Sequence, residues 1–174
     1  MTMTLVDTSQ LHSDRAEALH GRFRDTMSGV ATPVTVISAL EDGRPHGTTV
    51  SAFASLSMDP PMVMIALDRN SNLLPVIRRT QSFGVNVLGA DHHGVAAAFA
   101  RKGDDKFRGV DWTLDRGVPR LGGAIGWLRC DVDSLVPGGD HFIVQGLVLD
   151  AQQDVGAPLT YRSRAFGTHV PFAD

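Results

Sequence analysis

Residues 46–61 read HGTTVSAFASLSMDPP, and the rest of the chain can be organised around them. Four hydroxyl side chains lie between Thr48 and Ser55, Phe53 stands among small residues, and no charge appears before Asp59. Small residues let a planar ligand approach the backbone, and hydroxyls with nearby backbone N–H groups can hydrogen-bond its polar edge. Two prolines then end the segment, because proline neither continues a helix nor donates to a strand ladder. The pattern is typical of a Thr/Ser-rich strand and turn, and a site for a flat ligand is the alternative.

Composition narrows the classes of protein that fit. The chain has 174 residues, 43% hydrophobic and 20% charged, which suits one globular domain. A net charge of −3 argues against nucleic acid as the main partner. With one cysteine, Cys130, no intrachain disulfide can form. No apolar run is long enough to span a bilayer and the N-terminus lacks the plan of a signal peptide, so we expect a cytoplasmic protein without membrane contact.

Short apolar runs separated by turn residues predict a chain dominated by strands. The segment 62–67 is continuously apolar and predicts a strand buried on both faces, and 41–43 reads as a hairpin turn. The order is not the alternation of strand and helix that a parallel sheet requires. We therefore predict a mainly β fold, a closed or nearly closed antiparallel barrel capped by a few short helices. The expected strands lie at 34–37, 46–58, 62–67, 83–88, 128–133 and 142–149.

Helices and loops are expected between and before these strands. Residues 1–12 are polar and aperiodic and are expected to be loose, so that 13–174 form the single domain. Ser13 can cap a first helix that Gly29 ends. Asn72 is expected to cap a second helix, and Asp91 a third that Gly103 closes. The segment 103–123 is expected to be loop, and the tail from 157 to hold one short strand at most.

A series of short motifs gives the chain a family resemblance. In order and approximate spacing, residues 20–167 resemble the short-chain flavin reductases, the small partners of two-component flavin monooxygenases. The resemblance implies an FMN-binding split barrel, and a homodimer with flavin near the interface. The motifs are HGTTVSAFASLSMDPP (46–61), GVATPVTV (29–36), FGVNVL (83–88), AFA (98–100), DKF (105–107), GGDHF (138–142) and PLTYR (158–162).

The same resemblance implies where a flavin, FMN or FAD, would bind. It places part of the 46–61 stretch beside the isoalloxazine ring, and a helix start near the ribityl phosphate. A helix N-terminus suits a phosphate because it offers free N–H groups and the positive end of the helix dipole. Alternatively, Ser71 and Asn72 at this helix start only cap the helix. For Phe107 core packing is the favoured role. The implied flavin contacts are Val50, Ser51, Ala52, Phe53, Ala54, Leu56, Ser57, Ser71, Asn72, Leu73, Lys106 and Phe107.

The nicotinamide coenzyme, NADH or NADPH, is also placed by resemblance. No G-x-G-x-x-G follows a strand and opens a helix, so no Rossmann site is evident. The resemblance implies that the coenzyme folds against the flavin, held by Gly-Asp-His and a late tyrosine-containing segment. His141 could bond the carboxamide or a flavin edge and is the expected catalytic residue. The other implied contacts are Asp140, Thr160, Tyr161, Arg162 and Ser163.

Other chemistries have weaker support in the residues. His92 and His93 are adjacent and would point about 100° apart on a helix, so they cannot easily share a metal ion, and we expect none. Cys130 falls on the apolar face of its strand and is expected to be a buried structural thiol.

These observations favour an NAD(P)H:flavin oxidoreductase that treats flavin as an exchangeable substrate and supplies reduced flavin to a separate monooxygenase. Two alternatives stay open. One is a split-barrel protein that binds flavin or haem without turnover, and the other is an oxidase of a small substrate.

Overall fold

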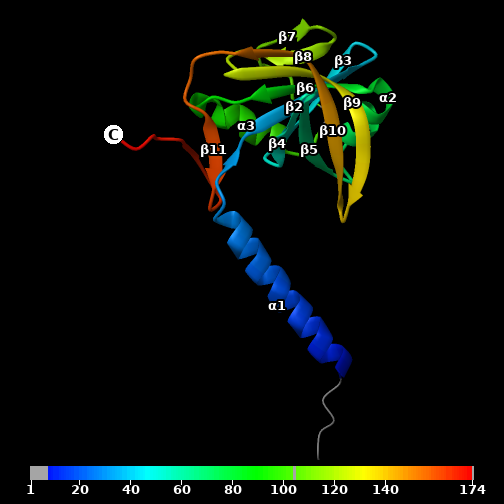
Figure 1. Cartoon of the computed structure of the whole chain (residues 1–174), viewed down its shortest axis with the longest axis vertical. Helices are drawn as coiled ribbons and strands as arrows, with labels where there is room; N and C mark the ends of the chain where they lie inside the picture. Colours follow the sequence, from blue (N-terminus) through cyan, green and yellow to red (C-terminus); the bar gives the residue numbers. More distant parts are fainter. Residues whose placement is uncertain (1–7, 104, 174) are drawn as a thin grey trace, which may run out of the picture.

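A long helix projects from the β-sheet body of the protein (Figure 1). The computed structural model describes residues 8–103 and 105–173, so residues 1–7 of the expected loose segment lie outside the described part. Residues 8–12 are not loose, since α1 spans Thr8–Ser28 and begins five residues before the expected start at Ser13. Its apolar face points to solvent, with 59% of Leu19, 63% of Phe23 and 48% of Met27 exposed. The expected first helix is therefore confirmed, and its apolar face is not covered by the described part of the chain.

The body is a seven-stranded sheet in which each ladder is antiparallel. Asp42 and Gly43 have φ of 50° and 76°, which confirms the predicted hairpin turn. The long strands β9 and β10 form the largest hairpin, and its tip carries the Gly-Asp-His motif. In sheet order the strands are β3 (Arg44–Val50), β2 (Thr35–Glu41), β6 (Ser82–Val87), β9 (Gly126–Gly138), β10 (His141–Gln153), β5 (Pro61–Asp68) and β4 (Phe53–Met58).

The fold is mainly β with few helices, as predicted, but the sheet is not a closed barrel. Its two ends are β3 and β4, and no ladder joins them in the described part of the chain. The chain passes from β3 to β4 through Ser51 and Ala52, where a single bond from Ala66 N to Ala52 O, 2.9 Å, reaches β5. The outer edge of β3 instead borders a helix and a cleft.

Two buried clusters hold the body together. The first lies between the sheet and α2 (Leu73–Thr80) and includes Ile65, Ile77 and Phe83. The second lies under α3 (His93–Ala100). Within β5 the residues Val63, Ile65 and Leu67 are buried while those between them are half-buried, so this strand buries one face and the expectation of two buried faces was wrong. Cys130 is buried, as predicted.

Three smaller predictions also need correction. Asp91 does not cap α3, because a short 3-10 turn, Ala90–His92, precedes the helix, and α3 ends at Ala100 rather than at the expected Gly103. The supposed loop 103–123 contains a hairpin, β7 (Trp112–Asp115) with β8 (Val118–Leu121). The tail holds two strands, β11 (Leu159–Arg162) and β12 (Ala165–Thr168), in a three-stranded sheet with β1 (Thr32–Pro33).

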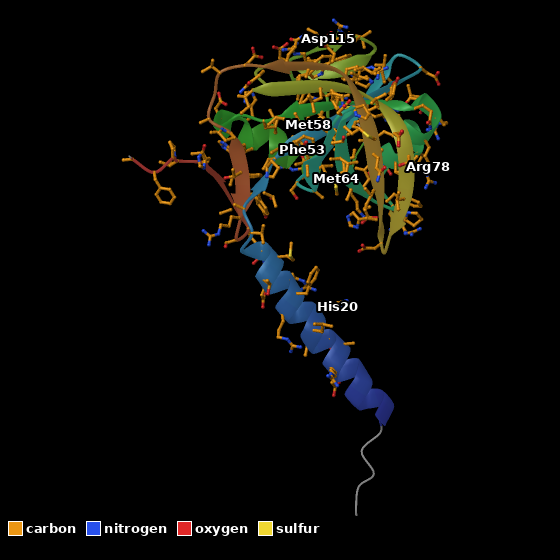
Figure 2. The ribbon with its side chains drawn as sticks, viewed as in Figure 1. His20, Phe53, Met58, Met64, Arg78 and Asp115 are labelled. Atoms are coloured by element: carbon orange, nitrogen blue, oxygen red, sulfur yellow. The ribbon has the colours of Figure 1, made fainter. Side chains whose placement is uncertain are left out.

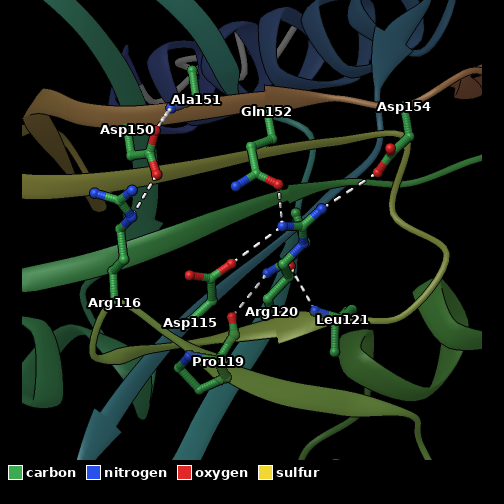
Figure 3. Close-up of polar contacts among 10 residues, drawn as sticks. Asp115, Arg116, Pro119, Arg120, Leu121, Asp150, Ala151, Gln152 and Asp154 are labelled. Atoms are coloured by element: carbon green, nitrogen blue, oxygen red, sulfur yellow. Dashed lines mark hydrogen bonds and ion pairs between the residues drawn. The ribbon is translucent and has the colours of Figure 1, made fainter.

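Charged side chains fasten the β7–β8 hairpin to the end of β10 (Figure 3). Arg120 Nη1 lies 3.2 Å from Asp115 Oδ2, Arg120 Nη2 lies 3.4 Å from Asp154 Oδ2, and the same guanidinium donates to Gln152. Arg116 Nε forms an ion pair with Asp150 Oδ2 at 2.7 Å. Such pairs leave no hydrophobic periodicity, which is why the sequence pattern did not reveal this hairpin.

Candidate functional site

A cleft of about 560 Å³ lies along the outer edge of β3. We call it the β3 cleft. Its walls come from β3 and the turn after it, the end of β5, the start of α2, the segment after α3, and His141 at the tip of the β9–β10 hairpin. Its volume falls in the range of small-molecule and cofactor sites. Nine of the predicted site residues line it: Val50, Ser51, Ala52, Ser71, Asn72, Leu73, Lys106, Phe107 and His141.

The hydroxyl-rich stretch is divided between the cleft and the fold. Thr48 and Ser51 line the cleft, and Ser51 is exposed. Thr49 Oγ1 donates to Ala96 O of α3 at 2.7 Å, so this hydroxyl fastens the helix to the strand. Ser55 lies on β4 and does not line the cleft. The small residues at the β3–β4 turn thus leave an open wall that a flat ring can approach.

The start of α2 forms a second wall. Ser71 Oγ accepts from Leu73 N at 3.3 Å, whereas Asn72 makes no side-chain capping bond. The expectation that Asn72 caps this helix was wrong, because Ser71 caps it and Asn72 already has helical φ and ψ of −62° and −21°. The exposed Asn72 amide is therefore not used in capping. Together with the positive end of this helix dipole it can meet an anion.

A third part of the lining follows the end of α3. Lys106 Nζ donates to Phe99 O at 2.9 Å, a cation placed at a helix C-terminus where the dipole favours it. Phe107 is buried, and its ring packs edge-on against Phe99 and Trp112 with centroids 4.9 and 5.6 Å apart. Packing in the core is thus its main role, as expected.

His141 is presented to the cleft by a well-braced turn. Arg69 N donates to Asp140 O at 2.9 Å, and Arg69 Nε donates to Gly139 O at 2.6 Å. The Phe142 ring lies between the guanidinium groups of Arg69 and Arg78, at 4.5 and 4.4 Å from its centroid. The side chain of His141 is 41% exposed, so the ring is available to a ligand.

The imidazole of His141 has one fixed partner. Its Nδ1 lies 2.8 Å from Asp140 Oδ1. This hydrogen bond, and secondly the charge of the ring, lower the pKa of Asp140 below its usual value. A carboxylate held ionised on one ring nitrogen leaves Nε2 to meet a ligand.

The remaining predicted residues lie outside the β3 cleft. Thr160, Tyr161 and Arg162 belong to β11 of the three-stranded sheet beside the end of α1, and Ser163 lies in the turn after β11. Arg162 Nε donates to Gly29 O at 2.9 Å, and Ser163 N donates to Ser28 O at 2.6 Å. The β4 residues Phe53, Ala54, Leu56 and Ser57 and the carboxylate residue Asp140 are also absent from the lining.

Cleft residues that the sequence analysis missed include Arg101 and Lys102. They directly follow the Ala-Phe-Ala motif and precede Asp-Lys-Phe, so their place between two motifs was the available signal.

Nucleophilic and metal chemistry gain no support from the structure. Burial raises the pKa of the Cys130 thiol to about 12, which keeps it protonated and inert. Within the described residues no three side chains of His, Cys, Asp or Glu gather as a metal site. None of the helices described there is long and apolar enough to cross a bilayer.

The family model of the flavin reductase-like domain matches residues 27–169, most of the chain. The chain belongs to the flavin reductase-like family. It is 38% identical over 159 residues to the reductase component of 4-nitrophenol 4-monooxygenase/4-nitrocatechol 2-monooxygenase from Rhodococcus opacus, covering 91% of this chain and 83% of that protein. It is 34% identical to the FMN reductase (NADH) SmoA from Agrobacterium fabrum, covering 95% and 97% of the two chains.

Solved structures agree with this family membership. The NADH:FAD oxidoreductase SgcE6 of Streptomyces globisporus, in complex with NAD and FAD fragments, superposes with a TM-score of 0.84 at 30% identity, covering 99% of this chain and all of that one. BorF, the flavin reductase component of a bacterial two-component tryptophan halogenase, superposes with a TM-score of 0.80 at 31% identity, covering 86% and 97%.

Proposed function

We propose that this flavin reductase-like protein is an NAD(P)H:flavin oxidoreductase that supplies reduced flavin to a separate monooxygenase. The supporting observation is the β3 cleft, which brings together Ser51, Asn72 and His141 from three distant parts of the chain. Relatives that are reductase components of monooxygenases support the delivery of reduced flavin. The hydride leaves C4 of the nicotinamide and arrives at N5 of the flavin, which gives oxidised coenzyme and reduced flavin.

The proposed flavin position follows from the walls of the cleft. The isoalloxazine ring lies against Val50 to Ala52. The resemblance also assigns Phe53, Ala54, Leu56 and Ser57 to the flavin, but these β4 residues do not line the cleft. The ribityl phosphate lies at the start of α2, where Ser71, Asn72 and Leu73 offer backbone N–H groups and positive dipole, with Lys106 on the other side. Reduced flavin gains negative charge at its N1–C2=O edge, so backbone donors near Ser51 would stabilise the product.

The role of His141 is to fix the relative position of the nicotinamide and isoalloxazine rings. Its Nε2 is placed to bond the coenzyme carboxamide or a flavin edge, while Asp140 fixes the ring through Nδ1. Stacking two planar rings at reacting distance is the main contribution that the protein makes, because the hydride chemistry belongs to the cofactors.

We further propose a homodimer. Leu19, Phe23 and Met27 form an exposed apolar stripe along α1. A second apolar surface lies at the β4–β5 edge, where Met58 is 83% exposed and Phe53 and Met64 are half-buried (Figure 2). Exposed apolar surfaces of this kind are typical of interfaces. Thr160 to Ser163 lie outside the cleft of their own chain, so a role in coenzyme binding would require the cleft of a second copy.

Light scattering tests the dimer. Phe23→Asp should give a monomer at micromolar concentration where the unchanged protein is a dimer, because a charge would be buried in the interface. The matched variant Arg24→Asp, next to it on the helix, should stay dimeric. A monomeric unchanged protein contradicts the proposal.

The single domain over 13–174, preceded by the first turns of α1, and the cytoplasmic location stay predictions.

Titration of the protein with NADH tests the proposed activity. Protein mixed with one equivalent of flavin should lose the absorbance of oxidised flavin as NADH is added without air. Flavin that binds, by fluorescence, but is not reduced would instead favour the non-catalytic binding protein.

A further inference from the structure

The β3 cleft has the opposite charge to the protein as a whole. The chain carries a net charge of −3. Among the residues that line the cleft, Arg101, Lys102 and Lys106 are cationic, and Asp68 is the one carboxylate. A concave site lined by one sign of charge focuses the field and attracts ligands of the opposite sign. The cleft is therefore suited to an anionic ligand, and its cations are gathered on the wall after α3.

These three cations differ in what their side chains already do. Lys106 Nζ is committed to Phe99 O at the end of α3. Arg101 and Lys102 are exposed, and neither side chain forms a hydrogen bond or ion pair with another described residue. The ion pair between Arg108 and Asp105, a few residues further along the chain, uses neither of them. The carboxylate on the lining, Asp68, accepts from Asn70 N at 2.7 Å within the turn between β5 and α2. The charges of Arg101 and Lys102 are thus uncompensated within the described chain.

The backbone fixes the direction from which these two residues meet the cleft. Arg101 leaves the helix with an extended ψ of 156° while its N–H still bonds Ala98 O at 3.3 Å. Gly103 then turns the chain with φ of 135°. Arg101 and Lys102 are thus the first two residues beyond the helix, and both line the cleft.

We propose that Arg101 and Lys102 form a subsite for the pyrophosphate of a dinucleotide, and that this subsite makes FAD the preferred flavin over FMN. The inference rests on the proposed function. In the proposed function the phosphate of FMN lies at the start of α2 and beside Lys106, so two further cations without a partner among the described residues match the second phosphate that only a dinucleotide has. Arginine and lysine are the side chains that recognise phosphate, through bidentate and point-charge contacts respectively. The nicotinamide coenzyme also carries a pyrophosphate and is the second source of this chemistry.

Flavin affinity of a charge-removing variant tests the subsite. In the double variant Arg101→Gln with Lys102→Gln, the Kd for FAD should rise about tenfold, or about 1.4 kcal/mol, while the Kd for FMN changes less than about twofold. The KM for NADH shows whether the two cations bind the pyrophosphate of the coenzyme. It is measured with riboflavin as acceptor, because riboflavin has no phosphate that could compete for them. The control Arg15→Gln with Arg24→Gln removes the same charge from exposed positions on α1, away from the cleft, and should leave the values unchanged.

Each outcome decides the proposal. A selective loss of FAD affinity supports the proposal. A raised KM for NADH with unchanged flavin affinities overturns the FAD preference and assigns the two cations to the pyrophosphate of the coenzyme instead. Equal weakening of FAD and FMN, or no change in any of the three constants, overturns it. If the unchanged protein does not reduce flavin with NADH, the proposed function fails instead, and the Kd values for FAD and FMN still judge the flavin subsite separately.

Discussion

The β3 cleft and the three-stranded sheet near α1 both carry residues that the family resemblance assigns to one site, yet they are built differently. The cleft collects residues from five segments around an open volume of about 560 Å³, and the Ser51, Asn72 and His141 side chains there remain accessible to a ligand. In the three-stranded sheet Arg162 and Ser163 bond the end of α1 instead. A side chain can carry chemistry only where it reaches the reacting atoms. We therefore expect substitutions in the cleft to change catalysis and substitutions in the small sheet to change it little.

The largest expected effect is that of His141→Ala. The rate of flavin reduction should fall about a hundredfold, as misplacement of reacting groups by about 1 Å does. The melting temperature should stay nearly unchanged, because the ring is 41% exposed and bonds only its neighbour Asp140 in the described chain. Stopped-flow absorbance and a thermal melt measure the two quantities. His169→Ala, in the exposed tail, is the matched control. A collapse of stability would show that the imidazole serves the fold.

Ser51→Leu should weaken flavin binding at least about tenfold, or about 1.4 kcal/mol. The added bulk would occupy the open wall where the ring is placed. Ser55→Leu makes the same change at an exposed position of β4 that does not line the cleft. Fluorescence titration should give a weaker flavin affinity for Ser51→Leu than for Ser55→Leu. Equal flavin affinities of the two variants would show that the isoalloxazine ring does not bind at this wall.

Asp140→Asn should slow flavin reduction by a smaller factor, about threefold to tenfold, because only the orientation of His141 is loosened. The pKa of the Asp140 carboxyl is lowered in the folded protein. The stability that its pair with His141 contributes is therefore present above the unfolded pKa of Asp140 and is lost as the pH falls through the lower folded pKa. Between pH 5 and 8 the carboxylate stays ionised. Equal rates of flavin reduction for the variant and the unchanged protein would contradict the positioning role of Asp140.

Arg162→Gln is expected to have the smallest effect. Its guanidinium donates to Gly29 O outside the cleft, so the Kd for flavin should stay within about twofold, or about 0.4 kcal/mol. A tenfold loss would show that the small sheet and the β3 cleft act as one flavin site. A raised KM for NADH alone would place the small sheet at the coenzyme of a second copy.

The fold was predictable wherever burial leaves a pattern. The alternation around Cys130 and the turn at Asp42–Gly43 gave correct strands, because one face of each strand is buried and the turn needs positive φ. The β7–β8 hairpin is fastened by Arg120 and its partners, and such ion pairs have no periodicity. The open edge of β3 is a property of strand order, which local sequence does not encode.

The candidate site was predictable in part for the same reason. The motifs assign Ser51, the start of α2 and His141 to one site, and all three line one cleft, while their role in flavin binding stays a prediction. They could not show that Thr49 fastens α3, or that Ser71 caps α2 while Asn72 does not, because these depend on contacts between elements. Arg101 and Lys102 were missed since charged residues after a helix are usually solvated surface.

Turnover of free flavin tests the central claim most directly. The protein is mixed with NADH and a large excess of flavin in the absence of air, and the absorbance of oxidised flavin is followed. A cleft that holds flavin through hydrogen bonds on open walls should bind at micromolar strength, about 8 kcal/mol, which permits exchange during turnover. Our account predicts that each subunit reduces many equivalents of flavin. Reduction of one equivalent and no more would show that flavin is a fixed cofactor and would contradict the account.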